Sequence, residues 1–315
     1  MEREMARIMH RRKRVGAADV FYRETVPETN DGGRPPVLLL HGFPSASHQF
    51  RSLMELLGDR IRMIAPDLPG FGHTQIIAGA EDVFEYSFDN LSRTIEELID
   101  ALNLESCVMY VFDYGGPVGF RIAARRPGLV AGLIIQNANA YDVGLSDAAR
   151  YFAAIDQGDA AGVAELERLL TPAGIKFQYE TGVQDPEAIS PDAYSMDEYF
   201  MNLPGRKAAN LQLLLNYKAN LMEYPAWQSW LRERLPPALI IWGRNDPLFI
   251  EAGARAYLAD LPHAELQLFN TGHFALEECL AAIAPLVEGF VENSALAPSA
   301  EPRPRLDAME TSLSA

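Results

Sequence analysis

The chain has 315 residues, 48% of them hydrophobic, which is enough for one large domain with a substantial buried core. Its 43 acidic and 27 basic residues give a net charge of −16, which argues against nucleic acid and an anionic membrane as partners. Cys107 and Cys279 lie far apart and form no disulfide framework or metal motif, and no apolar run reaches membrane-spanning length, so a cytoplasmic protein is expected. Whether it is a monomer or a homo-oligomer stays open.

Both ends of the chain are expected to be disordered. The first segment, residues 1–16, carries the basic run Arg11-Arg12-Lys13-Arg14, which is not followed by the apolar stretch of a secretory signal. We interpret this run as a solvated and mobile arm. The last segment, residues 293–315, consists mainly of Ala, Pro, Ser and charged residues, a composition that does not support a packed core.

Strands and helices alternate over the first part of the chain. The aromatic residues Phe21 and Tyr22 favour a strand over 19–25. Continuous apolar runs predict further strands, buried on both faces, at residues 36–40, 61–65, 107–112 and 133–135. Apolar side chains at helical spacing predict helices at residues 50–57 and 87–102. This alternation is typical of an α/β fold with a mostly parallel sheet and helices on both faces.

The pattern changes over residues 141–235, where strand-like runs give way to amphipathic segments rich in Tyr, Phe and Trp. We interpret this segment as a helical cap (lid) inserted into one α/β core, not as an independent domain. The core comprises residues 17–140 and 236–292, because buried strand patterns resume at 239–242 and 266–269.

Asp113 stands at the end of an apolar run and is followed by Tyr114, two glycines and a helix pattern. Strand, sharp turn and helix are the setting of a nucleophile elbow, in which small residues relieve the crowded turn. An aspartate there is already ionised at neutral pH and can attack saturated carbon to form an ester. The alternative is a strand-end aspartate that caps the next helix, which leaves the glycine pair unexplained.

Two further motifs follow predicted strands of the core: Asp246 follows the first strand after the cap, and His273 follows the last strand. Open α/β sheets place their sites at the carboxyl ends of strands, and the order nucleophile, acid, histidine is that of α/β-hydrolases. We therefore predict a catalytic triad of Asp113, Asp246 and His273. The strand end at residues 136–139 offers no carboxylate in place of Asp246.

The sequence His41-Gly42-Phe43-Pro44 follows the first buried strand. The backbone N–H groups of Phe43 and Tyr114 are expected to face one point and to form an oxyanion hole. The glycine would allow the backbone to approach closely. The alternative is that His41-Gly42 only ends a strand.

Together these residues resemble the epoxide hydrolase and haloalkane dehalogenase branch of the α/β-hydrolase superfamily. The resemblance covers roughly residues 18 to 292 and includes Asp67-Leu68-Pro69-Gly70-Phe71-Gly72. No Gly-x-Ser-x-Gly sequence occurs, which counts against serine-dependent esterases and lipases. The resemblance implies that Asp113 forms an ester with the substrate. Water activated by His273 and Asp246 then cleaves this ester, with no metal and no cofactor.

The leaving group decides between the two activities. An epoxide leaves as an alkoxide and needs a proton, which relatives with this activity take from lid tyrosines. Tyr217 lies where the family's lid tyrosine sits, and Tyr179 is a second, weaker candidate. We therefore expect a hydrolase that opens a small, apolar epoxide to a diol.

A haloalkane or haloacid dehalogenase is the alternative, because a halide leaves without a proton but needs N–H donors. Such enzymes place Trp beside the nucleophile and often Asn or Trp after His-Gly, where this chain has Tyr114 and Phe43. A cap indole, from Trp227 or Trp230, would then have to hold the halide. A third alternative is a hydrolase-fold binding protein without turnover, which the predicted triad disfavours.

Overall fold

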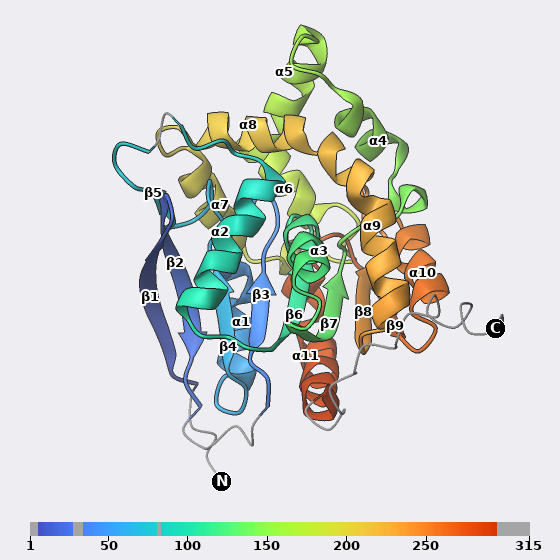
Figure 1. Ribbon diagram of the computed structural model, residues 1–315. Coiled ribbons are helices and arrows are strands. Elements are labelled where there is room, and N and C mark those ends of the chain that lie inside the picture. The colour runs from blue at the N-terminus through green and yellow to red at the C-terminus, as the bar shows by residue number, and fades with distance from the viewer. Residues whose placement is uncertain (1–5, 28–33, 81–82, 295–315) are drawn as a thin grey trace, which may run out of the picture.

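A computed structural model describes residues 6–27, 34–80 and 83–294, which are organised around one nine-stranded sheet (Figure 1). The strands lie side by side in the order β1-β2-β4-β3-β6-β7-β8-β9, and β5 pairs with β2. Their bounds are β1 Ile8–Val15, β2 Ala18–Thr25, β3 Val37–Leu40, β4 Met63–Pro66, β5 Gln75–Ile76, β6 Cys107–Phe112, β7 Val130–Gln136, β8 Ala238–Gly243 and β9 Glu265–Phe269. Strand β2 pairs antiparallel with β1, β4 and β5, and the pairs from β4 to β9 are parallel. The predicted fold class, an α/β fold with a mostly parallel sheet, is confirmed.

Helices cover both faces of this sheet, and Figure 1 shows α2 and α3 in front of it with α1 and α11 behind. The bounds are α1 Arg51–Leu57, α2 Phe88–Ala101, α3 Gly115–Arg125, α4 Asp147–Ala154, α5 Ala160–Leu169, α6 Pro172–Glu180, α7 Pro191–Met201, α8 Arg206–Asn216, α9 Lys218–Arg234, α10 Glu251–Asp260 and α11 Ala275–Ser294. Short 3-10 helices lie at η1 Ser47–Phe50, η2 Asp142–Gly144 and η3 Pro186–Ala188. None of the helices in the described part of the chain is long and apolar enough to cross a membrane.

Helix α2 illustrates how local sequence and packing agree. The Ser87 hydroxyl accepts the Asn90 N–H at the first turn, which satisfies one of the free donors of the helix start. Its buried stripe has helical spacing and consists of Phe88, Leu91, Ile95, Leu98 and Ile99. The helix predicted over residues 87–102 is therefore confirmed.

The predicted cap, residues 141–235, is described throughout and contains helices α4 to α9 and no strand. Figure 1 shows α4, α5 and α8 above the sheet, beyond the ends of its strands. Helix α9 descends from the cap and packs against α3 of the core. These helices therefore lie over the carboxyl ends of the strands that Asp113, Asp246 and His273 follow (Figure 1).

The expectation of a disordered extension over residues 1–16 is wrong for residues 8–15. They form β1, an edge strand that pairs with β2 along its whole length. The basic run at 11–14 lies on this strand, where Arg11 pairs with Glu24 and Arg12 with Asp19, at 2.8 and 3.0 Å. Charged side chains are a common feature of exposed sheet edges, and here they made a strand resemble a solvated arm.

At the other end, α11 continues through Ser294, so Asn293 and Ser294 are helical, contrary to the expected disorder from residue 293. The rest of that predicted tail, residues 295–315, lies outside the described residues, as do residues 1–5 of the predicted extension.

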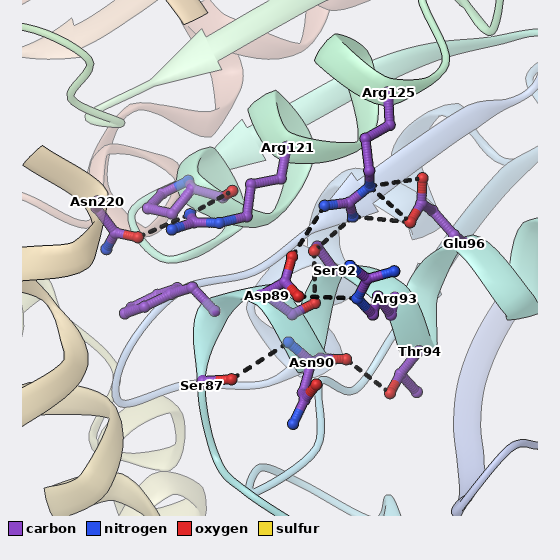
Figure 2. A network of polar contacts seen from close by, with 12 residues as sticks. Ser87, Asp89, Asn90, Ser92, Arg93, Thr94, Glu96, Arg121, Arg125 and Asn220 are labelled. Carbon is purple, nitrogen blue, oxygen red and sulfur yellow. Dashed lines mark hydrogen bonds and ion pairs between the residues drawn. The ribbon is translucent and has the colours of Figure 1, made fainter. Parts of the chain in front are cut away.

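A polar network joins α2, α3 and α9 (Figure 2). The buried guanidinium of Arg121 on α3 donates to the Asn220 side-chain oxygen of α9 at 2.7 Å and to the Pro117 carbonyl at 3.1 Å. One turn further along α3, Arg125 forms ion pairs with Asp89 and Glu96 of α2. Burial lowers the pKa of Arg121 to about 10, so this residue keeps its charge at neutral pH. The Arg121–Asn220 bond thus ties the cap to the core with a buried charge.

We predict that Asn220→Ala lowers the free energy of unfolding by about 2 kcal/mol, because the buried guanidinium of Arg121 loses the shorter of its two hydrogen bonds. Urea denaturation measures this change. Arg93→Ala is the control, since Arg93 pairs with Asp89 on the exposed surface of α2 and such pairs contribute little. Equal effects of the two substitutions would contradict the structural role assigned to the buried bond.

Candidate active site

Asp113 lies between buried strand β6 and helix α3 in a left-handed backbone conformation, with φ of 46°. A non-glycine residue in this region carries a strain of about 1–3 kcal/mol, which is typical of functional turns. Gly42 passes directly beside it: a Cβ on Gly42 would lie 2.2 Å from the Asp113 Cβ. The expected close approach of the His41-Gly42 backbone is therefore present, and only glycine fits there.

The Asp113 carboxylate is buried and receives two backbone hydrogen bonds. The Phe43 N–H donates to Asp113 Oδ1 at 2.6 Å, and the Tyr114 N–H also donates to this carboxylate. Burial raises the pKa of Asp113 to about 6, and His273 and the two N–H groups oppose this rise. At neutral pH the carboxylate is thus mostly ionised, and the two donors predicted to form an oxyanion hole converge on it.

His273 lies between the two predicted acids. Its Nδ1 is 2.5 Å from Asp246 Oδ2, and its Nε2 is 3.7 Å from Asp113 Oδ2. Burial alone would lower the pKa of His273, but the carboxylates of Asp246 and Asp113 raise it above its ordinary value. The structure therefore brings together all three side chains of the predicted triad, with Nε2 on the side of Asp113.

Asp246 is held by donors on both of its oxygens. Its Oδ1 accepts the N–H groups of Leu248 and Phe249 at 2.8 and 3.0 Å. Its Oδ2 accepts the amide of Asn137 at 2.8 Å in addition to the bond with His273. These four hydrogen bonds fix the orientation of the Asp246 carboxylate.

Asn137 is a site residue that the sequence analysis missed. It follows β7 with a positive φ of 40°, donates to Asp246, and accepts the Gly243 N–H at 2.9 Å. The available signal was an asparagine directly after a buried strand, because asparagine tolerates the left-handed region better than most residues.

His41 supports the loop that carries Phe43. Burial lowers the pKa of His41 to about 4, so the ring is neutral, and its Nε2 accepts the Leu68 N–H at 2.9 Å. The same ring packs edge-on against Phe71, with centroids 5.2 Å apart. The two glycine-containing motifs at 41–44 and 67–72 are thus fastened to each other beside the site.

A cavity of about 60 Å³ opens at Asp113 between the core and the cap. Its polar lining residues are Asp113, Tyr114, Gln178 and Tyr217. Its apolar lining consists of Phe43, Ala149, Phe152, Ala153, Leu166, Leu169, Leu214, Leu248 and Phe249. Tyr217, the first predicted leaving-group residue, therefore borders the same cavity as the carboxylate.

The other two predicted leaving-group residues do not line this cavity. Tyr179 donates its hydroxyl to Asp197 at 2.5 Å and stacks on Phe274 with ring centroids 3.9 Å apart. Trp227 is buried against Phe120 of the core, outside the cavity wall. Their expected roles are not supported by these positions, because both rings are packed against residues outside the cavity lining.

Gln178, the residue before Tyr179, was not singled out from the sequence. It is 3% exposed and lines the cavity. Glutamine in an amphipathic helix gives no signal of such a position, because it is common on solvent-facing surfaces. Among the described residues, no group of three or more His, Cys, Asp and Glu side chains is placed to hold a metal ion.

A family model described as alpha/beta hydrolase fold matches residues 35–279. This match covers most of the chain, so the protein belongs to the α/β-hydrolase fold family. A solved structure, haloalkane dehalogenase DbeA from Bradyrhizobium elkani, aligns with a TM-score of 0.74 at 24% identity over 93% of this chain and 100% of its own, which supports the fold alone.

Curated relatives extend this result. An uncharacterized hydrolase of Saccharomyces cerevisiae is 39% identical over 300 residues, 92% of this chain and 100% of its own. Haloalkane dehalogenase 2 of Mycobacterium tuberculosis is 29% identical over 83% of this chain and 90% of its own. Epoxide hydrolase 3 of Xenopus tropicalis is 26% identical over 85% of this chain and 74% of its own. Membership of the family supports the conclusion that the protein is a hydrolase. Its relatives include a haloalkane dehalogenase and an epoxide hydrolase.

We predict that Asp246→Asn lowers the pKa of His273 below its ordinary 6.5, because burial then outweighs the remaining carboxylate of Asp113. Titration of the His273 ring by NMR measures the shift. Asp260→Asn is the control, since Asp260 is a buried carboxylate bonded to Tyr141 elsewhere in the core. A His273 titration that is the same in both variants would contradict the coupling.

Proposed function

We propose that this hydrolase opens an apolar epoxide to a diol through an ester on Asp113. The observation that carries the proposal is that the buried carboxylate of Asp113 and the phenol of Tyr217 border one largely apolar cavity. A carboxylate supplies the nucleophile, and a neutral phenol supplies the proton that the epoxide oxygen needs.

The surroundings of Tyr217 support its role as a proton donor. Burial raises the pKa of Tyr217 well above its ordinary value, so the hydroxyl keeps its proton at neutral pH. This hydroxyl is hydrogen-bonded to that of Tyr224, whose oxygen also accepts the Asn139 amide at 3.2 Å. The Tyr224 hydroxyl raises the pKa of Tyr217, as an acceptor of its proton does, so the Tyr217 O–H turns from Tyr224 to the substrate oxygen when it donates.

In the first step, Asp113 Oδ2 attacks an epoxide carbon and the carbon–oxygen bond of the ring breaks. The alkoxide takes the Tyr217 proton, which produces a hydroxyalkyl ester and a phenolate. Oδ1, which accepts the Phe43 N–H at 2.6 Å, becomes the carbonyl oxygen of the ester. Asp113 itself is only 6% exposed, so little solvent reaches the nucleophile.

In the second step, water attacks the ester carbonyl and gives one proton to His273 Nε2. The Phe43 and Tyr114 N–H groups stabilise the oxyanion on Oδ1. The intermediate then collapses to the diol, whose departing oxygen takes the proton from His273. The second proton of the water returns to Tyr217, so that both residues are restored.

Hydrolytic dehalogenation is the second candidate, because the relatives include a haloalkane dehalogenase. A halide would need donors in the cavity, and the Tyr114 hydroxyl is buried without a hydrogen-bond partner among the described residues. The indoles of Trp227 and Trp230 do not line the cavity. The unpaired donors among the described lining residues are the Tyr114 hydroxyl and the Gln178 amide, and neither is an indole. The epoxide is favoured because Tyr217 supplies the proton that its oxygen needs.

We predict that His273→Gln traps the ester on Asp113, because the first step needs no base and the second does. Intact-protein mass spectrometry after incubation with a phenyl epoxide should give an increment equal to the whole substrate mass. A bromoalkane that reacts instead would add its alkyl group without bromine, so the increment itself distinguishes the two activities.

The control for this trap is Asp113→Asn combined with His273→Gln, which should remain unmodified with either substrate. Peptide mapping of the single variant should locate the added mass on Asp113. A protein that binds the epoxide but never gains mass would contradict the ester mechanism and would favour a binding role.

We also predict that Tyr217→Phe lowers kcat for epoxides by about a hundredfold, since it removes the proton donor. Steady-state assays measure this loss. Tyr199→Phe is a matched control, because the Tyr199 ring is exposed on the cap. If Tyr217→Phe keeps full epoxide activity, another group supplies the proton.

A further inference from the structure

We infer that Gln178 determines substrate specificity by donating an amide N–H to a hydrogen-bond acceptor on the substrate chain, an uncharged ether or carbonyl oxygen. This inference rests on the proposed epoxide hydrolase function and extends it to a substrate class. The role differs from that of Tyr217, which acts on the oxygen of the epoxide ring.

The Gln178 amide is buried without a hydrogen-bond partner for its nitrogen. The side chain is 3% exposed, and its Nε2 has no partner among the described residues. An unpaired buried donor is unfavourable, so such groups are rare and call for an explanation. Gln178 borders the cavity at Asp113, and a molecule bound there is the group that can accept this hydrogen bond.

Helix α6 places Gln178 in the lining of the cavity. Successive residues of an α-helix point about 100° apart, so Gln178 and Tyr179 face different sides. Tyr179 fixes the rotation of the helix, because its hydroxyl bonds Asp197 and its ring stacks on Phe274. The end of α6 also touches the histidine loop, where a Cβ on Gly272 would lie 2.0 Å from the Thr181 carbonyl oxygen.

The neighbours of Gln178 indicate that it contacts the substrate chain and not the reacting carbon. Helix α6 packs against α5, which contributes Leu166 and Leu169 to the apolar cap wall of the cavity. Tyr217, by contrast, packs beside Tyr114 next to the nucleophile, with ring centroids 6.2 Å apart. A single donor in an apolar wall favours a substrate that has an acceptor at that point. A substrate without this acceptor leaves the donor buried and unpaired.

The test compares a terminal epoxyhexanone with the terminal epoxyhexane in which CH2 replaces the carbonyl. We expect the protein to prefer the ketone by roughly tenfold in kcat/KM. Gln178→Met keeps a side chain of similar length but has no N–H, so the preference should disappear through loss of ketone activity. Gln184→Met makes the same chemical change on the exposed part of the cap and should leave the preference intact.

A preference that Gln178→Met leaves unchanged, or equal loss on both epoxides, would overturn the inference, and equal loss would place the amide at the leaving group. A binding measurement separates this result from failure of the proposed reaction. Hexan-2-one, which carries no epoxide, should bind to Gln178→Met with a higher Kd than to the unsubstituted protein. That difference is expected even if neither epoxide is turned over, and its absence would contradict the role of Gln178.

Discussion

The buried negative charge of Asp113 is the feature to which the surrounding structure is fitted. A carboxylate away from water is unfavourable unless donors and positive charge surround it. Here the Phe43 and Tyr114 N–H groups and the His273 ring provide them, and α3 begins immediately afterwards, so its positive dipole end faces the same charge. These contacts require the loop at 41–44 to cross the elbow closely, which explains why Gly42 has no space for a side chain.

The same constraint extends across the sheet through hydrogen bonds. His273 is oriented by Asp246, and Asp246 is held by Asn137, which also bonds the backbone of Gly243. Four neighbouring strands, β6 to β9, therefore contribute to one connected polar network at their carboxyl ends. Because each member satisfies another, removal of one leaves a buried group unpaired, and the network acts as a unit.

The sequence was sufficient to predict the buried strands and to select three side chains that the structure brings together, because both depend on local patterns. Buried strands appear as continuous apolar runs, and the elbow requires glycine at particular places, so Asp113, Asp246 and His273 could be located by order alone. Strand β1 was missed because its stability comes from pairing with β2 while its own residues are charged. Edge pairing leaves no apolar run to detect.

The cap was harder to predict because rotation of its helices is decided by tertiary contacts. In α6, Gln178 and Tyr179 are both buried, so periodicity alone does not indicate which of them faces the cavity. The contacts of Tyr179 with Asp197 and Phe274 decide it, and these partners lie far away in the sequence or in another element. The same holds for Trp227, whose ring packs on α3.

In the proposed mechanism the segment 141–235 would decide which substrate reacts, since an aspartate nucleophile can attack haloalkanes and epoxides alike. The proposed proton donor, Tyr217, lies at the junction of α8 and α9, and Asn220 lies in the first turn of α9. Asn220 is bonded to Arg121 of α3, the helix that begins at the elbow. Helix α3 thus begins beside Asp113 and, through Arg121, holds the helix that follows Tyr217. A shift of α9 would therefore change the distance between the Asp113 carboxylate and the Tyr217 phenol, so the buried guanidinium couples the packing of α9 to the geometry of the proposed reaction.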